Sequence, residues 1–90
     1  MAFAESKLES PCEELGAESN AEDLYRMGLV YSTGMGVAVD YVTAHKWFNL
    51  AALRGYSEAK ESRKELAGYM SSDEIALAQK AAREWLSLAN

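Results

Sequence analysis

The chain has 90 residues, 49% of them hydrophobic and 26% charged, and a formal net charge of -5. This length allows one small domain and excludes a deep cleft between domains. The acidic balance disfavours nucleic acid and anionic membrane surfaces as partners, because both attract a basic patch. We therefore expect a small globular domain with neither kind of partner.

Cys12 is the single cysteine, which excludes an internal disulfide and a zinc site built from thiolates. Its neighbours Glu13 and Glu14 disfavour the thiolate, so Cys12 makes a poor nucleophile. The chain has neither the pattern of a signal peptide nor an apolar window long enough to span a membrane. These features predict a cytoplasmic protein.

Residues 1–19 are expected to form an acidic N-terminal arm. Within it, "SPCEELG" has the signals of one short helical turn, with Ser10 as the cap, Pro11 in the first position and Gly16 at the end. A solvated arm without this turn is the alternative.

Helical signals become strong after residue 19. Two capping pairs can begin the first helix, namely Ser19 with Glu22 and Asn20 with Asp23. Its apolar positions share one side: Leu24, Met27, Val30 and Tyr31. The helix is expected to end near Thr33, because Gly34 adopts the left-handed conformation common at helix ends.

The second helix is expected to begin at Asp40, which caps it together with Thr43, and to stop at Gly55. Its apolar positions keep a helical spacing: Ala44, Trp47, Phe48, Ala51 and Ala52. His45 lies beside these positions, so we expect a surface histidine rather than a general base or a metal ligand.

Two further helices are expected. The third runs from about Ser57 to Gly68, is mostly charged, and has a small buried side formed by Ala59, Leu66 and Ala67. The fourth begins at "SSDE", a capping box of Ser71 and Glu74. Its apolar positions continue to the end of the chain: Ile75, Ala78, Ala82, Trp85, Leu86 and Ala89. No segment of more than a few residues alternates between apolar and polar residues with a period of two, so the chain is predicted to be all-α.

The helices repeat with a shift of 38 residues, which aligns Tyr31 with Tyr69 and Trp47 with Trp85. This register predicts a short α-solenoid of two antiparallel helix-turn-helix units, each of which buries its apolar stripe against the other. We expect the recurring aromatic residues to be core rather than a ligand cage. Four aromatic residues recur at this spacing, namely Tyr31, Tyr69, Trp47 and Trp85, and the chain also holds Phe48, which aligns with Leu86, and Tyr25, which aligns with Arg63.

Residues 20–59 resemble the Sel-one-like repeat, a branch of the tetratricopeptide-like helical repeats. The motif residues are Met27-Gly28, Tyr31, Gly34-x-Gly36-Val37, Asp40, Ala44, Trp47-Phe48, Ala51-Ala52 and Gly55. The resemblance implies one repeat at 20–56, a degenerate second repeat at 57–90 that acts as a C-terminal cap, and a non-enzymatic adaptor or regulator that binds proteins.

Gly34 and Gly36 also have the spacing of a phosphate-binding loop. Such a loop follows a strand and opens a helix, whereas here a helix precedes the glycines and Asp40 caps the next one. We therefore interpret the pair as the hinge of a helical hairpin, with Val37 packed under Gly34. The second hairpin lacks these glycines and is expected to turn more tightly through Met70 and Ser71, with looser or differently angled helices.

Two surfaces are candidates for protein binding. In tetratricopeptide-like stacks the first helix of each unit lines a concave surface that binds a partner, so the resemblance implies one groove for a protein or peptide. Its residues would be Glu22, Tyr25, Leu29 and Ser32, with Lys60, Arg63, Ala67 and Met70. A flank of the last helix is expected to be covered by the N-terminal arm, by another copy of the chain or by a partner, and its residues are candidates for self-association: Leu77, Ala81 and Leu88. The second surface supports the alternative of a structural unit that works as a homo-oligomer, such as a homodimer. No cofactor, metal or catalytic residue is expected.

Overall fold

The structure is a computed structural model, and it describes residues 20–89. These residues form α-helices and no strand, as predicted. The helices are α2 (Ala21–Thr33), α3 (Tyr41–Leu53), α4 (Ser57–Ala67) and α5 (Ser72–Ala89). The expectations for the acidic arm, its short helical turn and Cys12 lie outside the described residues.

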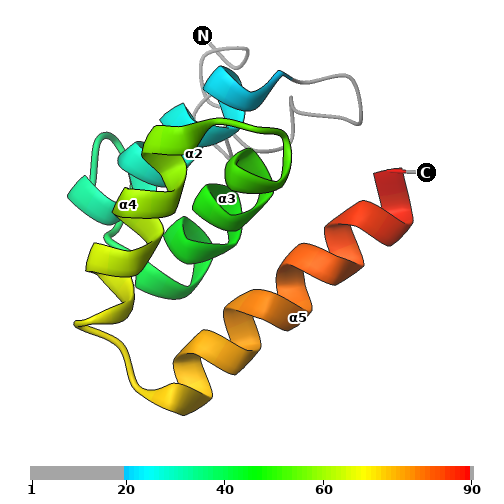
Figure 1. Cartoon of the computed structure of the whole chain (residues 1–90). Helices are drawn as coiled ribbons and strands as arrows, with labels where there is room; N and C mark the ends of the chain where they lie inside the picture. The colour runs from blue at the N-terminus through cyan, green and yellow to red at the C-terminus, as the bar shows by residue number, and fades with distance from the viewer. Residues whose placement is uncertain (1–19, 90) are drawn as a thin grey trace, which may run out of the picture.

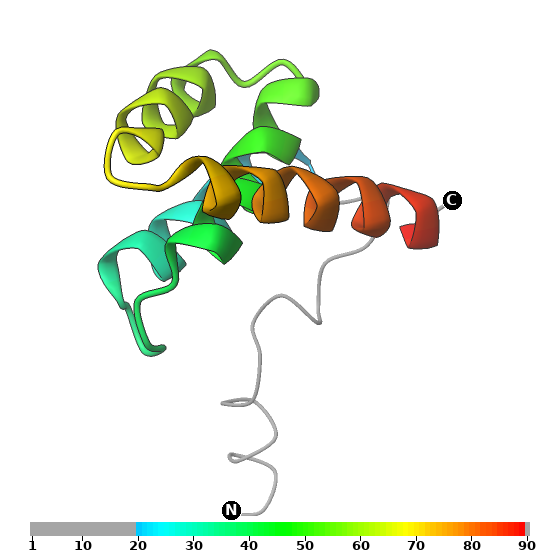
Figure 2. The same ribbon diagram turned by 90° about the horizontal axis from the view of Figure 1, so that it is seen from below.

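Helix α3 is the centre of the domain, and it packs extensively against α2, α4 and α5 (Figure 1). No other pair of described helices makes a comparably extensive contact. Helices α4 and α5 diverge from their connection, and α5 continues past α3 as one long helix (Figure 2). Helices α4 and α5 each pack on α3 rather than closely on one another, unlike α2 and α3.

Local capping signals fix where α3 and α5 begin. The Asp40 carboxylate accepts hydrogen bonds from the Thr43 backbone N–H (3.1 Å) and from the Thr43 hydroxyl (2.7 Å). At α5, the Glu74 N–H donates to Ser71 Oγ (3.1 Å), and the Ser71 N–H donates to Glu74 Oε1 (2.9 Å). Both caps are as predicted, because each depends on residues three positions apart.

Helix α2 begins at Asn20, whose Oδ1 accepts a hydrogen bond from the Asp23 N–H at 2.8 Å. Of the two capping pairs open from the sequence, the structure therefore uses Asn20 with Asp23. Arg26 lies one turn further on and forms ion pairs with Asp23 (3.3 Å) and Glu22 (3.5 Å). These exposed pairs stabilise the first turn only weakly.

The glycine pair forms a hinge between α2 and α3. Gly34 and Gly36 have φ values of 78° and 81°, a region that other residues enter only with strain. The Asp40 N–H donates to the Tyr31 carbonyl (2.9 Å), which ties the end of the hinge to α2. A Cβ atom placed on Gly34 would lie 3.0 Å from Val39 Cγ2, and Val37, expected to pack under Gly34, is half-buried. The second connection spans residues 68–71 against 34–40 for the first, so it is tighter, as predicted.

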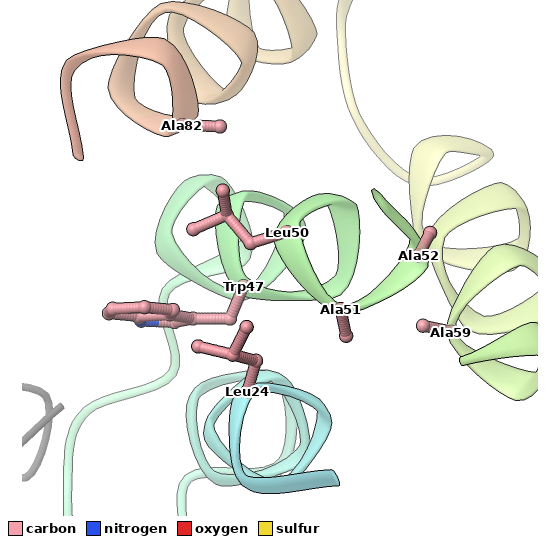
Figure 3. Packing of buried hydrophobic residues seen from close by; sticks show 7 residues of the cluster. All are labelled: Leu24, Trp47, Leu50, Ala51, Ala52, Ala59 and Ala82. Carbon is pink, nitrogen blue, oxygen red and sulfur yellow. The ribbon is translucent and has the colours of Figure 1, made fainter. Parts of the chain in front are cut away.

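The core lies around α3, where Trp47 contacts Leu24 of α2, and Leu50 points toward Ala82 of α5 (Figure 3). Helix α5 adds Trp85, whose ring meets Trp47 edge-on with the centroids 5.6 Å apart. The buried residues of this cluster come from all four described helices: Leu24, Trp47, Leu50, Ala51, Ala52, Ala59 and Ala82. Four of these seven residues are alanines, whose small side chains let the helices approach closely.

Tyr69 departs from the expected core. Its side chain is 78% exposed, and its ring meets that of Tyr41 at 6.4 Å between centroids. The repeat register aligned Tyr69 with half-buried Tyr31, but Tyr69 follows the end of α4 and lies in the short turn before α5. No helix covers it there.

Candidate protein-binding groove

A groove with a volume of about 220 Å³ lies between α2 and α4, with α3 beneath it. Its floor contains the buried side chains of Phe48 and Leu66, and its rim contains the exposed Glu65 and Tyr69. The complete lining is Leu29, Ser32, Tyr41, Phe48, Ser62, Glu65, Leu66 and Tyr69. An apolar floor with a polar rim is typical of a surface that receives a side chain of another protein.

Helical periodicity brings the lining residues of α4 together. Ser62, Glu65 and Leu66 are spaced i, i+3 and i+4, so they share the side that faces α2, and Tyr69 follows in the turn after α4. Across the groove, Leu29 and Ser32 are three positions apart on α2, and the Ser32 hydroxyl donates to the Leu29 carbonyl at 3.3 Å. Apart from Tyr69, which lies in the turn after α4, the lining residues therefore come from helices.

Tyr25 joins the two walls beside the groove. Its hydroxyl lies 3.2 Å from Ser62 Oγ, and its ring packs near those of Phe48 and Tyr56, with centroid distances of 5.4 and 4.9 Å. The predicted residues of α2 thus lie at this site, although only two of them line the groove. Glu22 is exposed on the first turn and pairs with Arg26.

The predicted stripe of α4 lies outside the groove. Arg63 donates from Nη1 to Asn49 Oδ1 of α3, and Met70 packs against the cluster that contains Phe48 and Leu66. Lys60 is exposed and Ala67 is half-buried. The structure therefore does not combine the two predicted stripes into one surface.

The residues of α4 that line the groove were missed because the third helix has few apolar residues to show its orientation. The 38-residue register assigned its outward stripe by analogy with the first helix. A usable signal was Leu66, because a large apolar residue on a charged helix marks its packed side.

The self-association candidates lie on one flank of α5. Leu77 and Leu88 are 57% and 86% exposed, and Ala81 is half-buried. The two leucines are separated by about three helical turns, so they form an elongated apolar flank rather than a pocket.

His45 is buried, with only 3% of its surface exposed, so the expectation of a surface histidine is wrong. Helices α4 and α5 both pack on α3 and cover positions beside its main apolar stripe. Burial, followed by the positive charge of Arg63, lowers the pKa of His45 below its usual value. Within residues 20–89, the buried Nδ1 has no hydrogen-bond partner. The imidazole is therefore held neutral inside the domain.

Metal and membrane sites were also sought in the described part of the chain. Residues 20–89 contain no group of three or more His, Cys, Asp or Glu side chains placed to hold a metal ion. No helix among these residues has both the length and the apolar character needed to cross a bilayer. The groove between α2 and α4 is one hollow in this part of the molecule; another, of about 550 Å³, lies beside the hinge between α2 and α3.

Comparisons with known proteins give no further identification. No family model matches the chain, and neither curated proteins nor solved structures match it. Function is therefore inferred from the geometry and chemistry of the groove.

Proposed function

We propose that this chain is a non-enzymatic protein-interaction module of the Sel-one-like type, an adaptor or regulator that binds a segment of another protein between α2 and α4. The observation that carries the proposal is the open groove over Phe48 and Leu66. An amphipathic helix or extended peptide binds such a groove by inserting apolar side chains.

The size of the groove supports a peptide side chain rather than a cofactor. Its volume of about 220 Å³ is below the roughly 300–1,000 Å³ of small-molecule sites. The lining also presents hydroxyl groups of Ser32, Ser62 and two tyrosines, which can donate to or accept from a peptide backbone. These features favour recognition over chemistry.

The proposed architecture is a two-unit solenoid, with a repeat at 20–56 and a degenerate repeat at 57–90 that ends the stack. Two observations support it: the hinge glycines adopt positive φ in the first unit, and the second unit has a shorter turn and a divergent last helix. A terminal unit with altered packing is common in repeat proteins. We place the protein in the cytoplasm under this proposal.

The second candidate function is self-assembly through α5. Its support is the exposure of Leu77 and Leu88 on one flank. Burying such a flank against a second copy would remove apolar surface from water, which favours association.

Site-specific photo-crosslinking distinguishes the two candidates. A benzophenone amino acid in place of Tyr69 puts the reactive group at the groove rim, and the same amino acid in place of Leu88 puts it on the flank of α5. We expect a discrete adduct with another protein from the Tyr69 position. Adducts only between copies of this chain, formed from the Leu88 position, would contradict the interaction-module proposal and support self-assembly.

A further inference from the structure

The charges of α4 are sorted by helix face. Glu58, Glu61 and Glu65 are spaced i, i+3 and i+7, which places them on one side. The cationic residues occupy another side: Lys60, Arg63 and Lys64. Two contacts fix the orientation, because Glu65 lines the groove and Arg63 turns toward Asn49 of α3. The acidic side of α4 therefore borders the groove, and its cations point elsewhere.

The other wall adds acidic charge at one end. Glu22 and Glu58 both lie near Tyr56. The pKa of Tyr56 is raised, mainly by its hydrogen bond to Glu58 and then by burial and by the negative charges of Glu58 and Glu22. Arg26 offsets part of this charge through its ion pairs with Glu22 and Asp23. Glu65 of α4 is therefore the carboxylate beside the apolar floor, and Glu22 and Glu58 add acidic charge near Tyr56.

The carboxylates nearest the groove have no cation of their own. Glu65 is the one charged residue in the lining, and within residues 20–89 neither Glu61 nor Glu65 forms an ion pair. A partner that covers them with apolar or acidic groups would remove water without replacing its hydrogen bonds, which is unfavourable. A partner with cationic side chains opposite these carboxylates would compensate their negative charge.

We infer that the groove binds a basic amphipathic segment, whose apolar side chain packs on Phe48 and Leu66 while its Lys or Arg side chains meet Glu61 and Glu65. This inference rests on the proposed function and names the class of partner. Tyr69 adds to the preference, because its exposed ring offers a face on which a guanidinium can stack beside Glu65.

Three matched peptides test the inference. Each has about 12 residues and one tryptophan anchor. The peptides differ at the remaining polar positions, which hold Arg and Lys in the basic peptide, Gln in the neutral peptide and Glu in the acidic peptide. Titration into the ¹⁵N-labelled full chain at about 50 mM salt reports which amides shift. We expect the basic peptide to shift Leu29, Ser62 and Leu66, and the acidic twin to bind at least about tenfold more weakly. Raising the salt to about 300 mM should weaken the basic peptide severalfold.

Substitutions in the chain provide the complementary measurement. Glu61→Gln with Glu65→Gln should weaken the basic peptide about three- to tenfold. Glu84→Gln is the matched control, since Glu84 is an exposed carboxylate on α5, and it should leave the affinity unchanged.

Each result decides the inference separately from the proposed function. Equal binding of all three peptides at the groove amides would overturn the charge preference and leave the groove as an interaction site. Shifts confined to α5, or no shift with the basic peptide, would overturn the inference, while crosslinking at Tyr69 still tests the proposed function independently.

Discussion

The ring of Phe48 occupies the space that a side chain on Gly28 would need. A Cβ atom placed on Gly28 would lie under 3.0 Å from three ring carbons of Phe48, which is closer than real Cβ contacts. Glycine at this position lets α2 approach α3, and the same ring then forms the floor of the groove.

Gly28→Ala should lower the free energy of unfolding by about 1–3 kcal/mol, because the added methyl group must displace Phe48 or separate the helices. The sign of the change in stability distinguishes the two effects, since helix propensity alone predicts that Gly28→Ala raises the free energy of unfolding by about 1 kcal/mol. Urea unfolding followed by circular dichroism measures the difference. In a Phe48→Leu background the same substitution should cost less; an equal cost in both backgrounds would contradict the contact.

The hinge glycines should respond to alanine in a fixed order. Gly36→Ala adds backbone strain of about 1–2 kcal/mol, since φ is positive and no atom lies near the new methyl group. Gly34→Ala should cost more, because its Cβ would also lie 3.0 Å from Val39 Cγ2. Chemical denaturation of both variants checks the order. Asn at either position, which tolerates this conformation, should be less costly than Ala.

Stability should fall as the pH drops below about 6.5, the unfolded-state pKa of His45. The folded-state pKa is lower, so the unfolded chain binds more protons in this range and is favoured. The stabilisation is therefore complete above pH 6.5 and is lost as the pH falls toward the folded-state pKa. Arg63 is the charged group that faces this imidazole and adds to the effect.

Urea unfolding at about pH 7.5 and about pH 5.5 measures this loss. His45→Leu is the control, because it fills the site without a titratable group, and its stability should change less between the two values. The same loss in both proteins would assign the pH dependence to other groups.

Local features of the fold were predictable from the sequence. The caps at Asp40 and Ser71 and the turn at Gly34 each depend on residues within a few positions, so the sequence signal is complete at short range. The apolar stripe of the second helix was also clear, because Trp47 and its neighbours repeat with a helical period.

Features that depend on how helices meet were not predictable in the same way. His45 is covered because α4 and α5 both pack on α3, and no neighbour in the sequence signals this. The groove side of α4 was missed because charged residues surround the whole helix, whereas its contacts with α2 through Ser62 select one side. The 38-residue register also placed Tyr69 in the core, although a shorter turn leaves it exposed.

The most direct test of the account is quantitative co-purification of partners from the native host with Tyr69→Ser and Leu53→Ser. Both side chains are large, apolar and exposed, at 78% and 65%, but only Tyr69 lines the groove. An exposed aromatic anchor commonly contributes about 1–2 kcal/mol to binding, so Tyr69→Ser should reduce the captured partner about tenfold. Leu53→Ser should leave capture unchanged, and both variants should keep the wild-type melting temperature. Equal capture by the two variants, or a loss confined to Leu53→Ser, would contradict the groove as the binding site.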